Sequence, residues 1–168
     1  MGLHFSFINI NRICSTLGEC KSRALPVFHA FTGCNCTSRF FGIGKLTAWQ
    51  AWEVNSQVTP ALEHISRHPF EPLNITSENF KILERMTIIM YKSSPLESVN
   101  EARMNLFSKR NRYLDNIPPT QDALLQHTRR AIYQAGIWTS SDAATPNVPS
   151  LSDYSGSKEK VGSGNRFG

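Results

Sequence analysis

Long apolar runs are missing from this chain of 168 residues. None approaches the roughly 18 consecutive apolar residues that a membrane-spanning helix needs. The start, residues 1–10, is apolar but lacks the basic segment and the small-residue cleavage site of a secretory signal peptide. We therefore expect no membrane partner and an intracellular location, with the nucleus as one option.

Cysteine pairs with the spacing of a structural zinc site are missing as well. Cys14, Cys20, Cys34 and Cys36 are separated by five, thirteen and one residues. Structural zinc sites usually combine two cysteine pairs, each with two to four intervening residues. We therefore expect free, reduced thiols rather than a metal site or disulfides.

Acidic residues are fewer than basic ones, 13 against 18, which gives a net charge of +5 and a pI of about 9.2. This mild excess permits a nucleic-acid partner without establishing one. Hydrophobic residues make up 40% of the chain. That share is enough for a modest core, and the length suits one domain.

The end of the chain differs in composition from the rest. Residues 140–168 are mainly Ser, Gly, Pro, Asn and Asp, with isolated apolar side chains. Such a segment cannot bury enough surface to offset its conformational entropy. We predict a helical domain over residues 1–139, which carries the whole net charge, and a disordered, dispensable tail over residues 140–168.

Within the predicted domain, apolar residues recur at spacings of three and four, which is typical of helices. Gly18 is expected to end a first helix that starts near residue 10. Ser22 is expected to cap a second helix, with Pro26 in its first turn, where a missing N–H is tolerated. The next helix should open at the turn of residues 42–45 and carry Trp49 and Trp52 as core residues.

Four further helices complete the expected bundle. Thr59 should cap the first of these and Ser77 the second. A third is predicted over about residues 96–109. Thr120 should cap the last, and Gly136 should end it. Because no alternating strand pattern or repeat occurs, the expected fold class is mostly α, a short helical bundle.

The most informative segment is residues 25–52, which contains the turn Gly42-Ile43-Gly44-Lys45. Glycines let the backbone approach a ligand closely. The first amides of the helix that follows lack partners and, with the helix dipole, favour an anion. Lys45 adds a full charge, so a nucleic-acid phosphate could be held here. A plain turn between helices is the alternative. The nucleotide-binding P-loop pattern is excluded, because Leu46 follows the lysine.

The motif Gly33-Cys34-Asn35, followed by Phe41 and the 42–45 turn, resembles the helix–three-turn–helix DNA-binding element of flap endonucleases and their XPG-type, PIN-like relatives. This likeness covers about residues 10–55. Most of residues 8–139 also resembles a large group of uncharacterised animal proteins with a His-Ala-Phe-Thr-Gly-Cys-Asp motif, for which a transposon association is one interpretation. The resemblance implies a nuclease-derived fragment that binds the DNA backbone through Gly42, Ile43, Gly44 and Lys45.

One departure from the family bears on catalysis. The resemblance implies Mg²⁺ in intact relatives, held partly by an aspartate at the position of Asn35. A neutral amide offers a carbonyl oxygen without charge, and hard cations favour carboxylates. The family's other acidic ligands come from a preceding α/β segment that has no counterpart here. We therefore expect no metal site, no catalytic residue and no nuclease activity of the chain alone.

Basic residues further along the chain could extend a phosphate-binding surface. Arg103 and Arg110 are the ones we expect to contact DNA, and Arg129 and Arg130 form a second basic pair. A solvated helix face is the alternative. His29 lies among apolar residues and is expected to be a core or boundary histidine.

Three functions stay open from the sequence. The first is a nuclease-derived DNA-backbone-binding domain. The second is a structural or protein-interaction module without nucleic-acid binding. The third is an active metal-dependent nuclease that takes its acidic residues from another chain.

Overall fold

The computed structural model describes residues 9–93, 95–108, 117–141, 143–145 and 147–150, and its regular elements are α-helices. In chain order the helices are α1 (Ile10–Phe31), α2 (Lys45–Val54), α3 (Val58–Arg67), α4 (Glu78–Met90), α5 (Val99–Ser108) and α6 (Gln121–Thr139). No strand occurs in these described ranges. The prediction of a mostly α, short helical bundle is confirmed.

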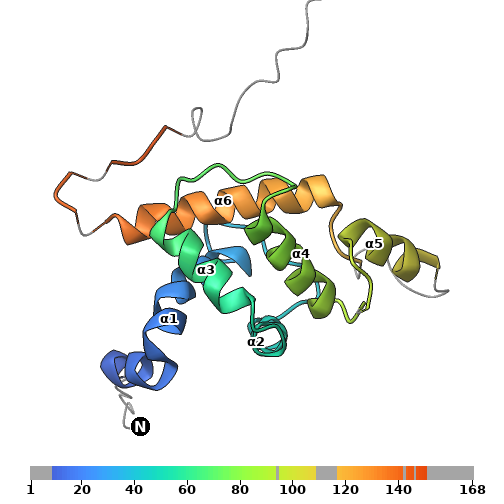
Figure 1. The fold of residues 1–168 in the computed structure, drawn as a ribbon, viewed down its shortest axis with the longest axis horizontal. Coiled ribbons are helices and arrows are strands. Elements are labelled where there is room, and N and C mark those ends of the chain that lie inside the picture. The colour runs from blue at the N-terminus through green and yellow to red at the C-terminus, as the bar shows by residue number, and fades with distance from the viewer. Residues whose placement is uncertain (1–8, 94, 109–116, 142, 146, 151–168) are drawn as a thin grey trace, which may run out of the picture.

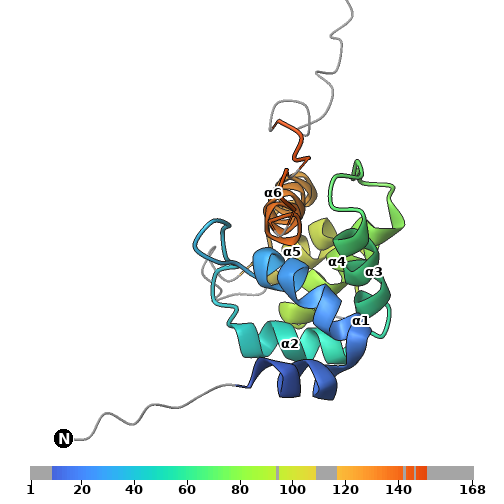
Figure 2. The same ribbon diagram turned by 90° about the vertical axis from the view of Figure 1, so that its left-hand side faces the viewer.

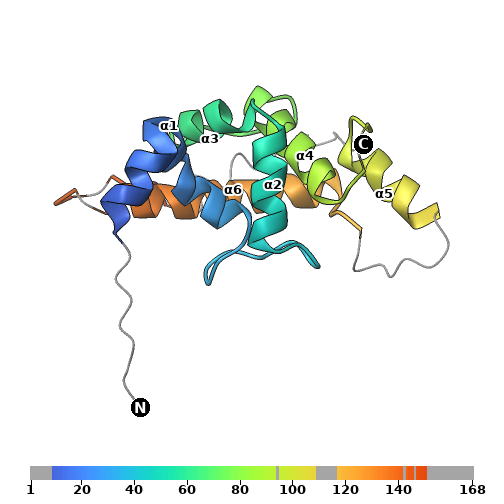
Figure 3. The same ribbon diagram turned by 90° about the horizontal axis from the view of Figure 1, so that it is seen from below.

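The bundle is arranged around α6, which contacts α1, α3 and α4 (Figure 1). Figure 2 looks nearly along α6 and shows the first three helices below it. The shorter α2 packs against α4 and runs across the direction of α6 (Figure 3). Helix α5 contacts α4 and lies at one end of the molecule. The first and last helices of the described chain are therefore direct neighbours.

Large apolar side chains from every helix fill the centre. Trp52 is 1% exposed, and its ring lies 4.7 Å from that of Phe28. Its indole N–H donates to the Thr59 hydroxyl over 2.8 Å, which satisfies the polar atom of an otherwise apolar side chain. Burying one such side chain contributes on the order of 1.5–3 kcal/mol to folding. The predicted core position of Trp52 is confirmed, and Trp49 is half-buried beside it.

Helix α1 has a bend where the sequence predicts an end. Gly18 adopts φ 78°, outside the helical region, and joins two helical segments. The second segment begins directly after it, so Ser22 lies inside the helix and is no cap. Pro26 consequently stands beyond the first turn, which the prediction had wrong. Because proline has no N–H, the bond that residue 26 would donate to the Ser22 carbonyl is missing.

The later helix boundaries follow local rules in two cases and tertiary contacts in two. Ser77 and Thr120 occupy the predicted N-cap positions. The Thr120 side chain accepts from the Ala123 amide, whereas the Ser77 side chain makes no cap bond to α4 and accepts from the Asn74 amide instead. Helix α3 begins at Val58 instead, with Gln57 at the N-cap position, and the Thr59 hydroxyl accepts from the Trp52 indole. The predicted end at Gly136 is wrong: α6 continues to Thr139.

Gly136 has a packing role in place of a terminating one. A Cβ at this position would stand 2.8 Å from Pro69 and from the ring of Phe70. Glycine therefore lets the α3–α4 connection lie directly on the backbone of α6.

The predicted tail falls largely outside the described residues, since 151–168 are not among them. The described residues 143–145 and 147–150 form no helix. The Tyr133 hydroxyl on α6 donates to the Pro149 carbonyl over 2.9 Å. Across the described chain, no helix combines the length and apolar character needed to cross a membrane.

Candidate nucleic-acid interface

The Gly42–Lys45 turn leads directly into α2, as predicted. Gly44 is the N-cap residue, and it has no side chain to bond the first amides. The first bond of the helix runs from the Ala48 amide to the Gly44 carbonyl over 3.1 Å. Among the described residues, no acceptor meets the amides of Lys45, Leu46 and Thr47. These amides form the kind of helix N-terminus that favours an anion.

The two glycines of the turn differ in backbone conformation. Gly42 has φ 70°, in the left-handed region that favours glycine. Gly44 has φ −87°, which any residue adopts. A Cβ on Gly44 would meet no atom within 4 Å. The space beside Gly44 is therefore open to a ligand.

Lys45 points back to the end of α1. Its ammonium donates to the His29 carbonyl over 2.8 Å and to the Thr32 hydroxyl over 2.6 Å. A cation at the C-terminal carbonyls of a helix complements the helix dipole. Burial lowers the pKa of Lys45, and the neighbouring Cys34 partly opposes this. Lys45 thus joins α1 to α2, and two of its three donors are engaged in doing so.

The charge of Lys45 also acts on His29, whose side chain is exposed on α1. Partial desolvation, followed by the Lys45 charge, lowers the pKa of His29. The His29 ring lies 5.8 Å from the ring of Trp138 at the end of α6. His29 therefore stands at the rim of the core, as the boundary interpretation expects.

The loop after α1 folds back over the end of that helix. Gly33 has φ 97°, and a Cβ there would stand 2.5 Å from the Cβ of Arg39. The Thr37 hydroxyl donates to the Ala30 carbonyl over 2.6 Å. The Gly33-Cys34 step is thereby explained by chain crossing, independent of any ligand.

The two cysteines of this loop are free thiols, as are Cys14 and Cys20. Burial would raise the pKa of Cys34, but hydrogen bonds with Thr37 and the backbone, together with the Lys45 charge, outweigh it and lower that pKa. Asn35 is exposed at the surface of the loop.

The structure brings Arg103 to the same side as the turn. A cavity of about 570 Å³ lies between the 38–41 segment, α5 and the start of α6. Arg39, Arg103 and Arg130 line it, and Arg103 also donates to the Pro118 carbonyl over 2.6 Å. Arg110 lies outside the described residues. Of the described residues that line the cavity, none is acidic.

A second hollow of about 300 Å³ adjoins this cavity. Phe41 and Tyr91 line both hollows, and Gly42, Thr47 and Lys92 belong to the second. Phe41 is 60% exposed. Burial raises the pKa of Tyr91 to about 12, so its phenol stays neutral. We call the two hollows with Arg39, Lys92, Arg103 and Arg130 the basic surface.

Sequence reasoning found only part of this surface. Arg39 follows the cysteine loop directly, and that position was the available signal. Lys92 lies just past the end of α4, far along the chain, and no motif marks it. Comparison of the chain with family models, with curated proteins and with solved structures gave no significant match. The likeness to flap endonucleases therefore stays a prediction.

Proposed function

We propose that this chain binds the phosphate backbone of nucleic acid, independent of base sequence, through the basic surface. One observation carries the proposal: arginines from three separate segments and Lys92 gather around two connected hollows without an acidic lining residue among those described. The unpartnered amides at the start of α2 border the second hollow at Thr47.

Each group suits a phosphate oxygen in a different way. An arginine offers a planar fork of donors, which matches phosphate in two-point contact. Backbone amides at a helix N-terminus add fixed partial charge. Such contacts place the protein on the backbone and carry no base information. Weak binding follows, with a Kd on the order of 10⁻⁴ to 10⁻⁶ M at physiological salt.

Lys45 contributes to this surface in two ways under the proposal. Its charge lies close to the turn, and its bonds to α1 set the direction of α2. Replacing Lys45 therefore removes one charge and loosens the turn. Replacing Arg39 or Arg130 removes charge alone, so these are the sharper variants.

The test is a titration of fluorescent duplex DNA at two salt concentrations. Wild type should bind several unrelated sequences equally, with affinity that falls steeply as salt rises, because counterions are released. Arg39→Ala, Arg130→Ala and Lys45→Ala should each weaken binding and make the salt slope shallower by roughly one unit. Lys81→Ala, at the opposite end of α4, has the same charge change and should bind as wild type.

Two outcomes would contradict the proposal. Equal binding by Arg39→Ala, Arg130→Ala and Lys81→Ala would show that net charge alone attracts DNA. No binding by wild type at low salt would leave the turn as a plain connection.

A parallel incubation of the DNA and protein with Mg²⁺ addresses the nuclease alternative. Cleavage abolished by EDTA would favour it, whereas Asn35 in place of a carboxylate leads us to expect none.

A protein-interaction module is the second candidate, and α5 favours it. Met104 is 75% exposed and Phe107 is 70% exposed, three residues apart on one helix. Adjacent large apolar side chains in water are typical of a contact surface. If this candidate holds, Met104→Ser and Phe107→Ser should change self-association in sedimentation while DNA binding stays as in wild type.

A further inference from the structure

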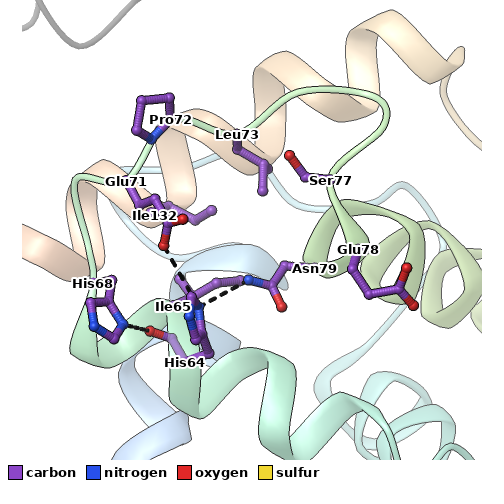
Figure 4. A pocket seen from close by; sticks show the side chains of 10 residues that line it. All are labelled: His64, Ile65, His68, Glu71, Pro72, Leu73, Ser77, Glu78, Asn79 and Ile132. Carbon is purple, nitrogen blue, oxygen red and sulfur yellow. Dashed lines mark hydrogen bonds and ion pairs between the residues drawn. The ribbon is translucent and has the colours of Figure 1, made fainter.

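Two histidines and a glutamate gather at the end of α3, on the connection that leads to α4. His64 lies in the last turn of α3, His68 caps the helix, and Glu71 follows. Their ligand atoms all lie within 4.8 Å of one another. Figure 4 shows the three side chains beside one hollow of about 280 Å³, with Asn79 approaching His64 from α4.

The hydrogen bond of His68 leaves one ring nitrogen able to bind a cation. Its Nδ1 lies 3.1 Å from the His64 carbonyl oxygen. A carbonyl can only accept, so Nδ1 carries the proton and Nε2 keeps its lone pair. Histidine ligands commonly hold their second nitrogen on a backbone carbonyl in this way, which sets the ring orientation.

The Nδ1 atom of His64 lies beside Glu71. Its Nδ1 is 3.1 Å from the Asn79 amide nitrogen and 3.8 Å from a Glu71 carboxylate oxygen. Because the amide nitrogen donates, the His64 Nδ1 is unprotonated, and its lone pair faces the gap between Asn79 and Glu71. A cation in this gap would take the place of the Asn79 donor.

The backbone on either side of Glu71 is held against α6. Pro69 and Phe70 lie against the backbone of α6 at Gly136. The Arg129 guanidinium donates to the Leu73 carbonyl over 2.9 Å. The backbone that carries Glu71 is thus anchored before and after it, and only its side chain needs to adjust.

We propose that His64, His68 and Glu71 bind one divalent transition-metal ion, Zn²⁺ by preference. Imidazole nitrogens suit zinc, and two histidines with one glutamate are a known zinc ligand set that leaves a fourth position open. Around a tetrahedral ion, ligand atoms stand roughly 3.3 Å apart, given zinc–nitrogen distances of about 2.0–2.1 Å. The side chains of His64 and Glu71 are 47% and 58% exposed, so rotation can close the remaining distance.

This site is separate from the basic surface and from the position of Asn35. Binding would connect the end of α3 to the loop that rests on α6, and the open position could take water or a partner's side chain. Because the ligands are side chains at the protein surface, their replacement should leave the fold intact.

The test is a titration of the full chain with Co²⁺, followed by visible absorption, and with Zn²⁺ by competition. We expect one equivalent to bind, with no sulfur-to-cobalt charge-transfer band. His64→Gln, His68→Gln and Glu71→Gln should each weaken binding at least about tenfold. Two control variants should bind the metal as wild type does. Glu78→Gln changes a residue that lines the same hollow without belonging to the cluster, and His29→Gln removes a distant imidazole.

Unchanged affinity in the His64→Gln and His68→Gln variants would overturn the proposal. A strong sulfur band, lost on Cys34→Ser, would do so too, because the thiols would then be the ligands. If a variant fails to fold, a measurement on the wild-type protein still tests the site. On addition of Zn²⁺, the ring-proton resonances of His64 and His68 should shift while those of His29 and His127 stay. Shifts spread equally over all four would also contradict the site.

Discussion

Gly33 is the residue on which the shape of the cysteine loop depends. Its φ of 97° and the closeness of the Arg39 backbone both exclude a side chain. Arg39 is in turn part of the basic surface. A single glycine at the end of α1 therefore determines where Arg39, one of the proposed phosphate contacts, lies.

Gly33→Ala should destabilise the protein by about 1–3 kcal/mol, since it combines left-handed backbone strain with overpacking. Gly44→Ala is the matched control: its backbone is ordinary and its surroundings are open. The control should cost less than about 1 kcal/mol, the loss of a favourable N-cap residue. Urea unfolding of both variants gives the comparison. Equal losses would mean that the Gly33 contact with Arg39 relaxes without cost.

At the scale of elements, α5 depends on a residue of α4. Glu84 is 5% exposed, and its carboxylate accepts from the Val99 amide over 2.9 Å. The same carboxylate accepts from the Gln121 side chain at the start of α6 over 3.0 and 3.2 Å. One buried acid thus caps α5 and links three helices.

Glu84→Ala should lower the free energy of unfolding by roughly 2–3 kcal/mol, because buried donors lose their acceptor. The loss should appear first in α5. Amide exchange at Val99 and in the following turn should accelerate more than exchange in α3. Glu101→Ala, on the exposed side of α5, removes a carboxylate as a control. If both variants unfold alike, the Glu84 bonds contribute little net stability.

Helix starts that depend on neighbouring residues were predictable, as Ser77 and Thr120 show. Thr59 and Gly136 were wrongly interpreted because distant groups, Trp52 and Phe70, use those positions. The same division holds for the basic surface. The turn at α2 could be located from its glycines, whereas Arg39 and Lys92 come to line adjoining hollows only through the folding of a loop and the packing of α2 on α4. No spacing in the sequence encodes that arrangement.

For the molecule as a whole, His127 links α6 to the end of α1. Its Nε2 lies 2.7 Å from the Phe31 carbonyl, and its ring packs 4.9 Å from that of Phe40. Burial, and then the charge of Arg130, lowers the pKa of His127, although the bond to Phe31 opposes this. The interior of the bundle therefore favours the neutral ring.

A lowered pKa in the folded state has a definite sign for stability. Above the unfolded value of about 6.5 the ring is neutral in both states, and its contribution is fully present. As pH falls below that value, the unfolded chain takes up the proton first, and the contribution is lost. Wild type should thus melt at a higher temperature than His127→Gln, and this difference should be smaller at pH 5 than at pH 7.5. His64→Gln, on the exposed side of α3, serves as the control, and a pH-independent difference for His127→Gln would contradict the assignment.

The pairing of α1 with α6 also has a consequence for the order of events at the ribosome. Of the described helices, α6 is made last, and Val27 and Phe31 on α1 emerge long before it. Until then, the apolar side of α1 has to be shielded by transient contacts or by a chaperone. Contacts between the two ends of a domain also slow its folding, because a long loop must close first. Nascent chains arrested before α6 should accordingly remain sensitive to protease, and protection should come in one step when α6 is complete.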